Sequence, residues 1–86
     1  MKPWYVYILR CSDGTLYTGI TNDVEKRTTA HNEGCGARYT RSRRPVELVC
    51  QEQAESRSKA TLREMEIKRM SRKRKMEMIG DEARTS

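Results

Sequence analysis

The feature that most limits the folds open to this chain is a pair of aromatic and β-branched segments close to its start. Residues Trp4 to Arg10 contain no glycine or proline, and a segment of the same character runs from Thr15 to Ile20. Ser12-Asp13-Gly14 lies between them, and residues of these types favour a tight reversal of the chain. The sequence therefore predicts a β-hairpin with one strand in each segment.

The length of the turn decides which side chains share a face of this hairpin, because a shift of one residue moves every side chain to the other face. With a two-residue turn, Tyr7 and Tyr17 point to opposite faces. With the turn Ser12-Asp13-Gly14 and a left-handed glycine, Tyr7 lies opposite Gly19 and both tyrosines share a face. The second register is our hypothesis, and it predicts a Cys11–Thr15 pair.

The middle of the chain predicts a helix, a loop and a further strand. Asn22 and Glu25 have the spacing of a capping box, which predicts a helix from about Asp23 to His31. The arginine-rich stretch from Ala37 to Arg44 indicates a loop. Alternating apolar residues then predict a third strand from Val46 to Glu52.

Two more helices follow the third strand. Ser56 or Ser58 can cap one that reaches Met70, and Ser71 can cap a short one that ends at Gly80. The predicted element order is β-β-α-β-α-α. A three-stranded antiparallel sheet flanked by helices is the economical way to bury the apolar faces of these elements, so the predicted fold class is α+β.

Size and composition limit what the chain can be. Eighty-six residues, of which 35% are hydrophobic and 35% charged, allow one domain with a thin core. We expect this domain at residues 2–79, followed by a disordered tail at residues 80–86. Three widely spaced cysteines and one histidine fit neither a disulfide framework nor a zinc site. The longest apolar stretch, residues 4–9, is far below the roughly 20 residues of a membrane span, and no signal peptide is recognisable, so we expect a cytoplasmic protein.

The positive charge of the chain is concentrated in its second half. Residues 36–75 carry thirteen basic and five acidic side chains, whereas residues 1–35 carry four of each. Such a basic segment is typical of proteins that bind a polyanion, because neutralised phosphates release condensed counterions. A solvated helix face is the alternative, and charge alone does not separate the two. The residues that we expect to contact a nucleic acid are Arg38, Arg41, Arg43, Arg44, Lys68, Arg72 and Lys73.

Four side chains in the first half of the chain could take part in phosphate chemistry. Tyr7 and Tyr17 supply phenols from the hairpin, and Arg27 and His31 lie four residues apart on one face of a helix. A phenol can position water, or release its proton where cations lower its pKa from about 10, and a guanidinium can stabilise a phosphorane. From spacing alone, cross-strand packing of the tyrosines and a solvated helix face are the simpler explanation.

Glu64 and Glu66 are the acids within the strongly basic part of the second half. Glu64 lies close to the apolar edge marked by Ala60 and Ile67, where it could face inward as an oxygen ligand for a divalent ion. Helical spacing does not choose between the two acids. A Glu64–Lys68 ion pair at i, i+4 accounts for Glu64 equally well.

Together these motifs resemble the GIY-YIG nuclease superfamily, and more narrowly its small single-domain bacterial proteins. The resemblance covers roughly residues 2–79. Its specific parts are Tyr5-Val6-Tyr7, Tyr17-Thr18-Gly19-Ile20-Thr21, Arg27 with His31-Asn32, Ala37-Arg38-Tyr39-Thr40-Arg41, and Ala60 through Glu64 to Lys68. The first two motifs differ in letters from the family pattern but keep its tyrosines and glycine.

The resemblance implies an endonuclease that hydrolyses DNA phosphodiester bonds with a divalent metal ion. It implies Tyr7 as general base or water-positioning group, with Tyr17 as its hydrogen-bonding partner. Arg27 would stabilise the phosphorane, and His31 would assist or hold a phosphate oxygen. Glu64 would bind one Mg²⁺ or Mn²⁺ ion.

The resemblance also bears on the substrate. Gly19 would let the backbone approach the scissile phosphate. No accessory DNA-binding domain is recognisable, so we expect low sequence specificity, with branched or damaged DNA as candidate substrates and a protein partner as a candidate source of specificity. The alternative is a nucleic-acid-binding module whose catalysis is lost or depends on a partner.

Overall fold

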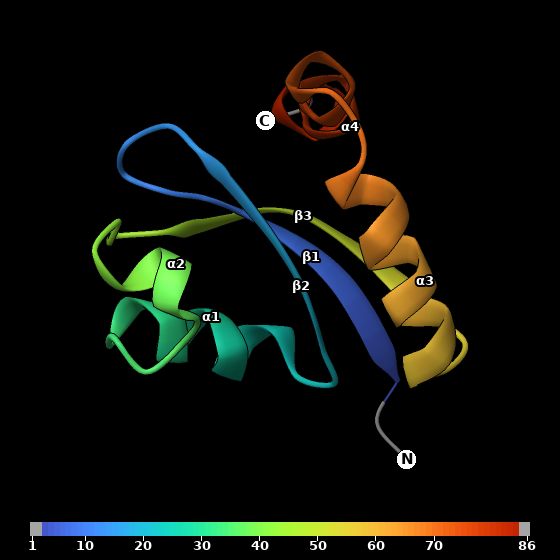
Figure 1. Cartoon of the computed structure of the whole chain (residues 1–86), viewed down its shortest axis with the longest axis horizontal. Coiled ribbons are helices and arrows are strands. Elements are labelled where there is room, and N and C mark those ends of the chain that lie inside the picture. Colours follow the sequence, from blue (N-terminus) through green and yellow to red (C-terminus); the bar gives the residue numbers. More distant parts are fainter. Residues whose placement is uncertain (1–2, 85–86) are drawn as a thin grey trace.

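The computed structural model of the chain describes residues 3–84. Its elements are, in order, β1 (Trp4–Arg10), β2 (Leu16–Thr21), α1 (Val24–Asn32), α2 (Arg38–Arg41), β3 (Glu47–Ala54), α3 (Arg57–Lys68) and α4 (Arg72–Arg84). The strands form one antiparallel sheet in the order β2-β1-β3, with α1 and α2 on one face and α3 and α4 on the other (Figure 1). The α+β class and the element order are confirmed, and the expected loop at residues 37–44 contains one added helical turn, α2.

The core lies in two layers, one on each face of the sheet, because side chains alternate along the central strand β1. The buried residues on the α3–α4 side are Val6, Ile8, Cys50, Ala60, Ile67 and Ile79, and those on the α1–α2 side are Tyr7, Leu9, Cys11 and Val46. Since β1 is covered on both faces, all of residues 6–9 are buried. Tyr7 is therefore a core residue as well as a predicted site residue.

The hairpin adopts the register in which both site tyrosines share a face. Tyr7 pairs with Gly19, and the Cys11 N–H donates to the Thr15 carbonyl at 2.8 Å. Gly14 has a φ of +84°, the left-handed conformation that this turn requires. The register hypothesis is confirmed, and this register places Tyr17 on the same side of the sheet as Tyr7.

The third strand differs from the predicted regular alternation because it contains a β-bulge. The register shifts so that Val49 is an extra residue between Leu48 and Cys50. Cys50 therefore packs on the α3–α4 side, whereas Val46 packs on the α1–α2 side. An uninterrupted strand would have placed both on one face.

The helix starts confirm two predicted caps and correct a third. Asp23, rather than Asn22, caps α1, because the Asp23 carboxylate accepts a hydrogen bond from the Lys26 N–H at 3.1 Å. Ser56 caps α3, and the Ser71 hydroxyl oxygen accepts from the backbone at the start of α4. An acid at the cap also complements the helix dipole, which favours Asp23 over its neutral neighbour.

The last helix is longer than predicted. It continues through Gly80 to Arg84, so Gly80 does not end it. A glycine inside a helix costs only about 1 kcal/mol relative to alanine, and the buried neighbour Ile79 packs this turn against the sheet. Of the expected tail, residues 85–86 lie outside the described residues. No helix within residues 3–84 is long and apolar enough to cross a membrane.

Asn32 joins the end of α1 to the segment that enters β3. Its Oδ1 accepts from the Val46 N–H at 2.7 Å, and its Nδ2 donates to the Val46 carbonyl at 3.0 Å. One side-chain amide thus satisfies both polar groups of a backbone unit, as a neighbouring strand would. The intervening residues 33–45 are closed into a loop by this pair of bonds.

Asn32→Ala removes both bonds and leaves the Val46 backbone groups without them, so the free energy of unfolding should fall by about 1–3 kcal/mol. Urea denaturation followed by circular dichroism measures the change. Asn22→Ala is the matched control, since the exposed Asn22 side chain has no hydrogen-bond partner within residues 3–80. It should shift stability by less than about 0.5 kcal/mol; equal losses in the two variants would contradict the role given to Asn32.

Candidate active site

A hydrogen-bonded pair of buried side chains lies on the α1–α2 side of the sheet. The Tyr7 hydroxyl is 2.9 Å from His31 Nε2, and neither residue is more than 1% exposed. Tyr7 comes from the central strand and His31 from the last turn of α1. The pair therefore joins the sheet to the helical layer.

The second ring nitrogen of His31 is held by α2 and the residue before it. His31 Nδ1 lies 2.7 Å from Thr40 Oγ1, and the Thr40 hydroxyl donates to the Ala37 carbonyl at 2.9 Å. The single hydroxyl proton of Thr40 is used in the bond to Ala37, so His31 Nδ1 must carry a proton and donate it to Thr40 Oγ1. His31 Nε2 is then unprotonated and accepts from the Tyr7 hydroxyl. The Ala37 N–H also approaches Nδ1, at 3.4 Å, and the two shorter bonds outweigh that contact.

Two glycines make room for these rings. A β-carbon at Gly19 would lie 2.5 Å from the Tyr7 hydroxyl oxygen, and one at Gly36 would overlap His31 Nδ1. The contact that requires Gly19 in this structure is therefore with the Tyr7 phenol. Gly36 was not among the predicted site residues, and neither was Thr40, although the motif around Tyr39 includes it.

Burial sets the protonation state of the pair. Desolvation raises the pKa of Tyr7 above its usual value near 10, interaction with Arg27 offsets this only in part, and the charges of Tyr17 and Glu64 raise the pKa further. Burial, and then the charge of Arg27, lowers the pKa of His31 below 6.5. At neutral pH the pair is a phenol and a neutral imidazole. Arg27 does lower the pKa of Tyr7, but the lost hydration outweighs this cation, so the chain by itself keeps the phenol protonated.

Arg27 and Glu64 approach the Tyr7–His31 pair from the two helical layers. Arg27 is half-buried and lies one turn before His31 in α1. The Glu64 side chain, from α3, is 19% exposed, and its charge acts on Tyr7. Glu66, in contrast, is 65% exposed. Of the two acids that helical spacing left equal, Glu64 is the one that lies inward and near the phenol.

A cleft of about 280 Å³ opens beside the pair. Its lining residues come from β2, α2 and the two C-terminal helices: Leu16, Tyr17, Thr18, Tyr39, Lys68 and Lys75. Of the two site tyrosines only Tyr17 lines the cleft, and Tyr7 lies in the core behind it. The two lysines make the cleft suitable for a phosphate. Lys75 lies within the basic segment at residues 36–75 that we expect to meet a polyanion, although it is not among the residues singled out there.

Glu64 is the predicted ligand for a divalent ion, and its surroundings fit a weakly held one. Its Oε2 lies 3.5 Å from Lys68 Nζ, which confirms the i, i+4 pair. The described residues hold no group of three or more His, Cys, Asp or Glu side chains that could bind a metal ion. A single carboxylate suits Mg²⁺, which keeps several waters and uses phosphate oxygens as further ligands.

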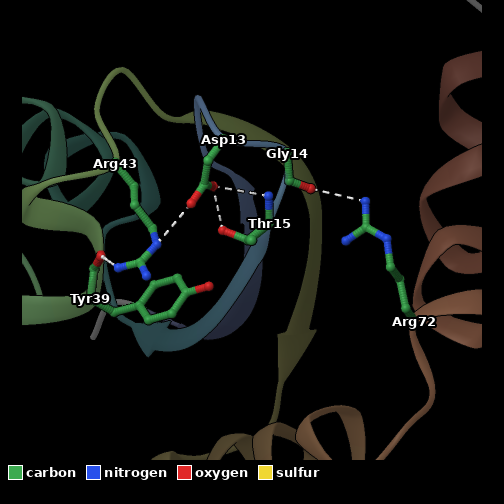
Figure 2. A network of polar contacts seen from close by, with 6 residues as sticks. All are labelled: Asp13, Gly14, Thr15, Tyr39, Arg43 and Arg72. Atoms are coloured by element: carbon green, nitrogen blue, oxygen red, sulfur yellow. Dashed lines mark hydrogen bonds and ion pairs between the residues drawn. The ribbon is translucent and has the colours of Figure 1, made fainter.

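The basic residues expected to contact a nucleic acid have unequal surroundings. Three of them also hold other parts of the chain through hydrogen bonds: Arg43, Arg44 and Arg72. Figure 2 shows two of these, with Arg43 and Arg72 reaching the hairpin turn from opposite sides. Three others are exposed, and their side chains have no hydrogen-bond or ion-pair partner among the described residues: Arg38, Arg41 and Lys73. The charges of this last group are available to phosphates without breaking a contact.

Comparison with known proteins shows where the chain belongs. A family model described as "GIY-YIG catalytic domain" matches residues 3–77. A "UPF0213 protein" of Staphylococcus saprophyticus is 51% identical over 81 residues, which cover 94% of this chain and 99% of that protein. A second, from Clostridium perfringens, is 52% identical over 79 residues, which cover 92% of this chain and 85% of that protein.

Two solution NMR structures are similar as well. The UPF0213 protein BH0048 of Bacillus halodurans is 44% identical, with a TM-score of 0.58, and the match covers 91% of this chain and 83% of that one. The protein EF2693 of E. faecalis is 43% identical, with a TM-score of 0.63, over 94% of this chain and 86% of that one. Since the likeness extends over most of the sequence and of the fold, the chain belongs to the GIY-YIG domain family, as one of its small single-domain bacterial members.

Proposed function

We propose that the protein is an endonuclease that hydrolyses DNA phosphodiester bonds, uses one divalent metal ion and has low sequence specificity. The observation that carries the proposal is the hydrogen bond between Tyr7 and a neutral His31, next to a basic cleft. The match to a model of a catalytic domain supports it.

The Tyr7–His31 pair is our candidate acceptor for the proton of the attacking water, and because Tyr7 is only 1% exposed this water must reach the phenol oxygen from the neighbouring cleft. As the phenol oxygen of Tyr7 takes a proton from water, its own proton passes to His31 Nε2, which already accepts its hydrogen bond. The bond from His31 Nδ1 to Thr40 keeps the ring in the tautomer that this transfer needs. No free tyrosinate is required, which matters because burial makes that state costly.

Charge on the phosphate is met by groups from both helical layers. The Arg27 guanidinium would bind the oxygens on which negative charge builds. Glu64 would hold Mg²⁺ or Mn²⁺, and such an ion supplies charge neutralisation and a lower pKa for bound water. A phosphate that binds Lys68 in the cleft would draw this ammonium away from Glu64 and free the carboxylate.

The substrate is contacted mainly through phosphates in this proposal. The cleft is lined by lysines and tyrosines, and two exposed arginines belong to the same short helix, α2, as its lining residue Tyr39. Phosphate contacts position a nucleic acid without reading its bases. Selectivity for branched or damaged DNA, or a protein partner, would then decide where the enzyme cuts.

Glu64→Gln keeps the size of the side chain but removes its charge, so metal-dependent cleavage should fall by at least about 10²-fold. DNA affinity should stay within a few-fold. The assay incubates the chain with supercoiled, branched and single-stranded DNA in Mg²⁺, Mn²⁺ or chelator. Glu66→Gln is the control and should cut like the wild type. If Glu64→Gln cuts DNA at the wild-type rate, Glu64 has no part in the mechanism. If the wild-type chain binds DNA but cuts none of these substrates, the alternative of a nucleic-acid-binding module is favoured.

The pH dependence of cleavage tests the proton acceptor. His31 must be neutral, and its pKa is lowered, so the single-turnover rate should rise with pH to a midpoint below 6.5 and then level off. A tyrosinate base would give a rise that continues towards pH 10. Since the unfolded chain binds the proton more tightly, stability should also fall as the pH drops below about 6.5. ¹⁵N NMR of this one imidazole measures its pKa directly.

Arg38→Gln and Arg41→Gln test the charges of α2. If each arginine contacts one phosphate, each change should reduce the slope of log K against log salt by about 0.9. Fluorescence anisotropy with a labelled duplex measures the slope. Arg57→Gln alters the net charge equally at the opposite end of α3 from Lys68, and it should leave the slope unchanged. The same loss in all three variants would indicate only a general effect of net charge.

A further inference from the structure

Tyr17 lines the cleft without a polar anchor of its own. Its hydroxyl forms no hydrogen bond with any residue that the structure describes. Its ring lies 5.2 Å from the buried His31 ring and 6.0 Å from the Tyr39 ring, between centroids, and it stacks on the latter at an interplanar angle of 24°. The Tyr7 ring lies 6.4 Å away as well. Of these three ring neighbours Tyr7 and His31 are buried in the core and Tyr39 is exposed, so Tyr39 is the one whose position can change without disturbing the core.

Tyr39 in turn depends on Arg43. Tyr39 belongs to the single turn of α2 and is 38% exposed. The Arg43 guanidinium carbon lies 4.0 Å from the centroid of its ring, and Nη1 of the same group donates to the Tyr39 carbonyl at 2.9 Å. Arg43 thus holds both the ring and the backbone of Tyr39.

Asp13, at the tip of the hairpin, fixes Arg43. Its Oδ2 accepts from Arg43 Nε at 2.9 Å, and its Oδ1 accepts from the Thr15 N–H at 3.1 Å and the Thr15 hydroxyl at 2.6 Å. These bonds, those of Thr15 first, lower the pKa of Asp13. Figure 2 shows the carboxylate between its two partners, while Arg72 of α4 donates to the adjacent Gly14 carbonyl at 2.9 Å.

We propose that Asp13 is a positioning residue for Tyr17, acting through Arg43 and Tyr39. The carboxylate holds the guanidinium over the Tyr39 ring, and Tyr39 keeps the Tyr17 phenol in place at the cleft. The proposal rests on the proposed nuclease function. The Arg43 and Asp13 side chains are 35% and 44% exposed, and ion pairs this exposed contribute little to stability. Loss of the pair should therefore affect the reaction more than the fold.

Asp13→Asn separates positioning from general electrostatics. Asparagine keeps a side-chain oxygen that can accept hydrogen bonds from Thr15, but it lacks the negative charge that forms the ion pair with Arg43. The variant chain is also one unit more positive, which by itself would tighten DNA binding. We expect kcat to fall about tenfold because Tyr17 is misplaced, with KM unchanged or lower.

Matched variants isolate the link. Glu47→Gln makes the same change of net charge at another exposed pair, with Arg10 at 3.4 Å, and should keep the wild-type kcat. Arg43→Lys keeps the charge but loses the planar group over Tyr39, so it should match Asp13→Asn. The double variant should be no slower than either single one, because both changes break the same link.

A spectroscopic readout tests the link without any cleavage. Nuclear Overhauser effects between the Tyr17 and Tyr39 ring protons should weaken in Asp13→Asn and persist in Glu47→Gln, while the two variants melt within a few degrees of each other. Unchanged ring contacts, or a wild-type kcat, in Asp13→Asn would overturn the positioning role. If the wild type cuts no DNA, the nuclease proposal fails separately, and the ring contacts alone then decide whether Asp13 holds Tyr17.

Discussion

The register of the β1–β2 hairpin is the constraint on which the rest of the site depends. The turn that ends at Gly14 pairs Tyr7 with Gly19 and puts Tyr17 on the same face. A shift of one residue would send one of these tyrosines to the α3–α4 side. It would also remove the space that Gly19 leaves for the Tyr7 hydroxyl, and with it the route from Tyr7 to His31.

Local chemistry was the part of this structure that the sequence could predict. The turn residues around Gly14 and the serine caps act on their immediate neighbours, so their effect is visible in a short stretch of sequence. The resemblance to the family added the prediction that four distant residues come together in one site: Tyr7, Arg27, His31 and Glu64. The α2 turn is too short to show helical periodicity, and the bulge at Val49 arises from pairing with β1 rather than from its own side chain.

Features that depend on packing between distant segments were not predictable in this way. The raised pKa of Tyr7 follows from burial of its side chain in the core on the α1–α2 side, which outweighs the nearby cation. Gly36 and Thr40 matter because α2 folds back onto His31. Arg43 and Arg72 looked like free positive charge in the sequence, whereas each donates to a specific partner in the hairpin turn. A count of basic residues in the sequence therefore overestimates how many of them are free to bind a ligand.

The two-layer arrangement has a consequence for the order in which the parts of the site become available during synthesis. Glu64 and the lysines of the cleft follow all three strands in the chain, whereas Tyr7 belongs to the first strand, β1. A polypeptide still emerging from the ribosome can form the hairpin early, but it lacks the carboxylate and the ammonium groups until synthesis is nearly finished. A half-made copy would therefore contain the phenols, the imidazole and the Arg27 guanidinium without the Glu64 carboxylate and the lysines of the cleft, so the candidate site is complete only once α3 and α4 have been made.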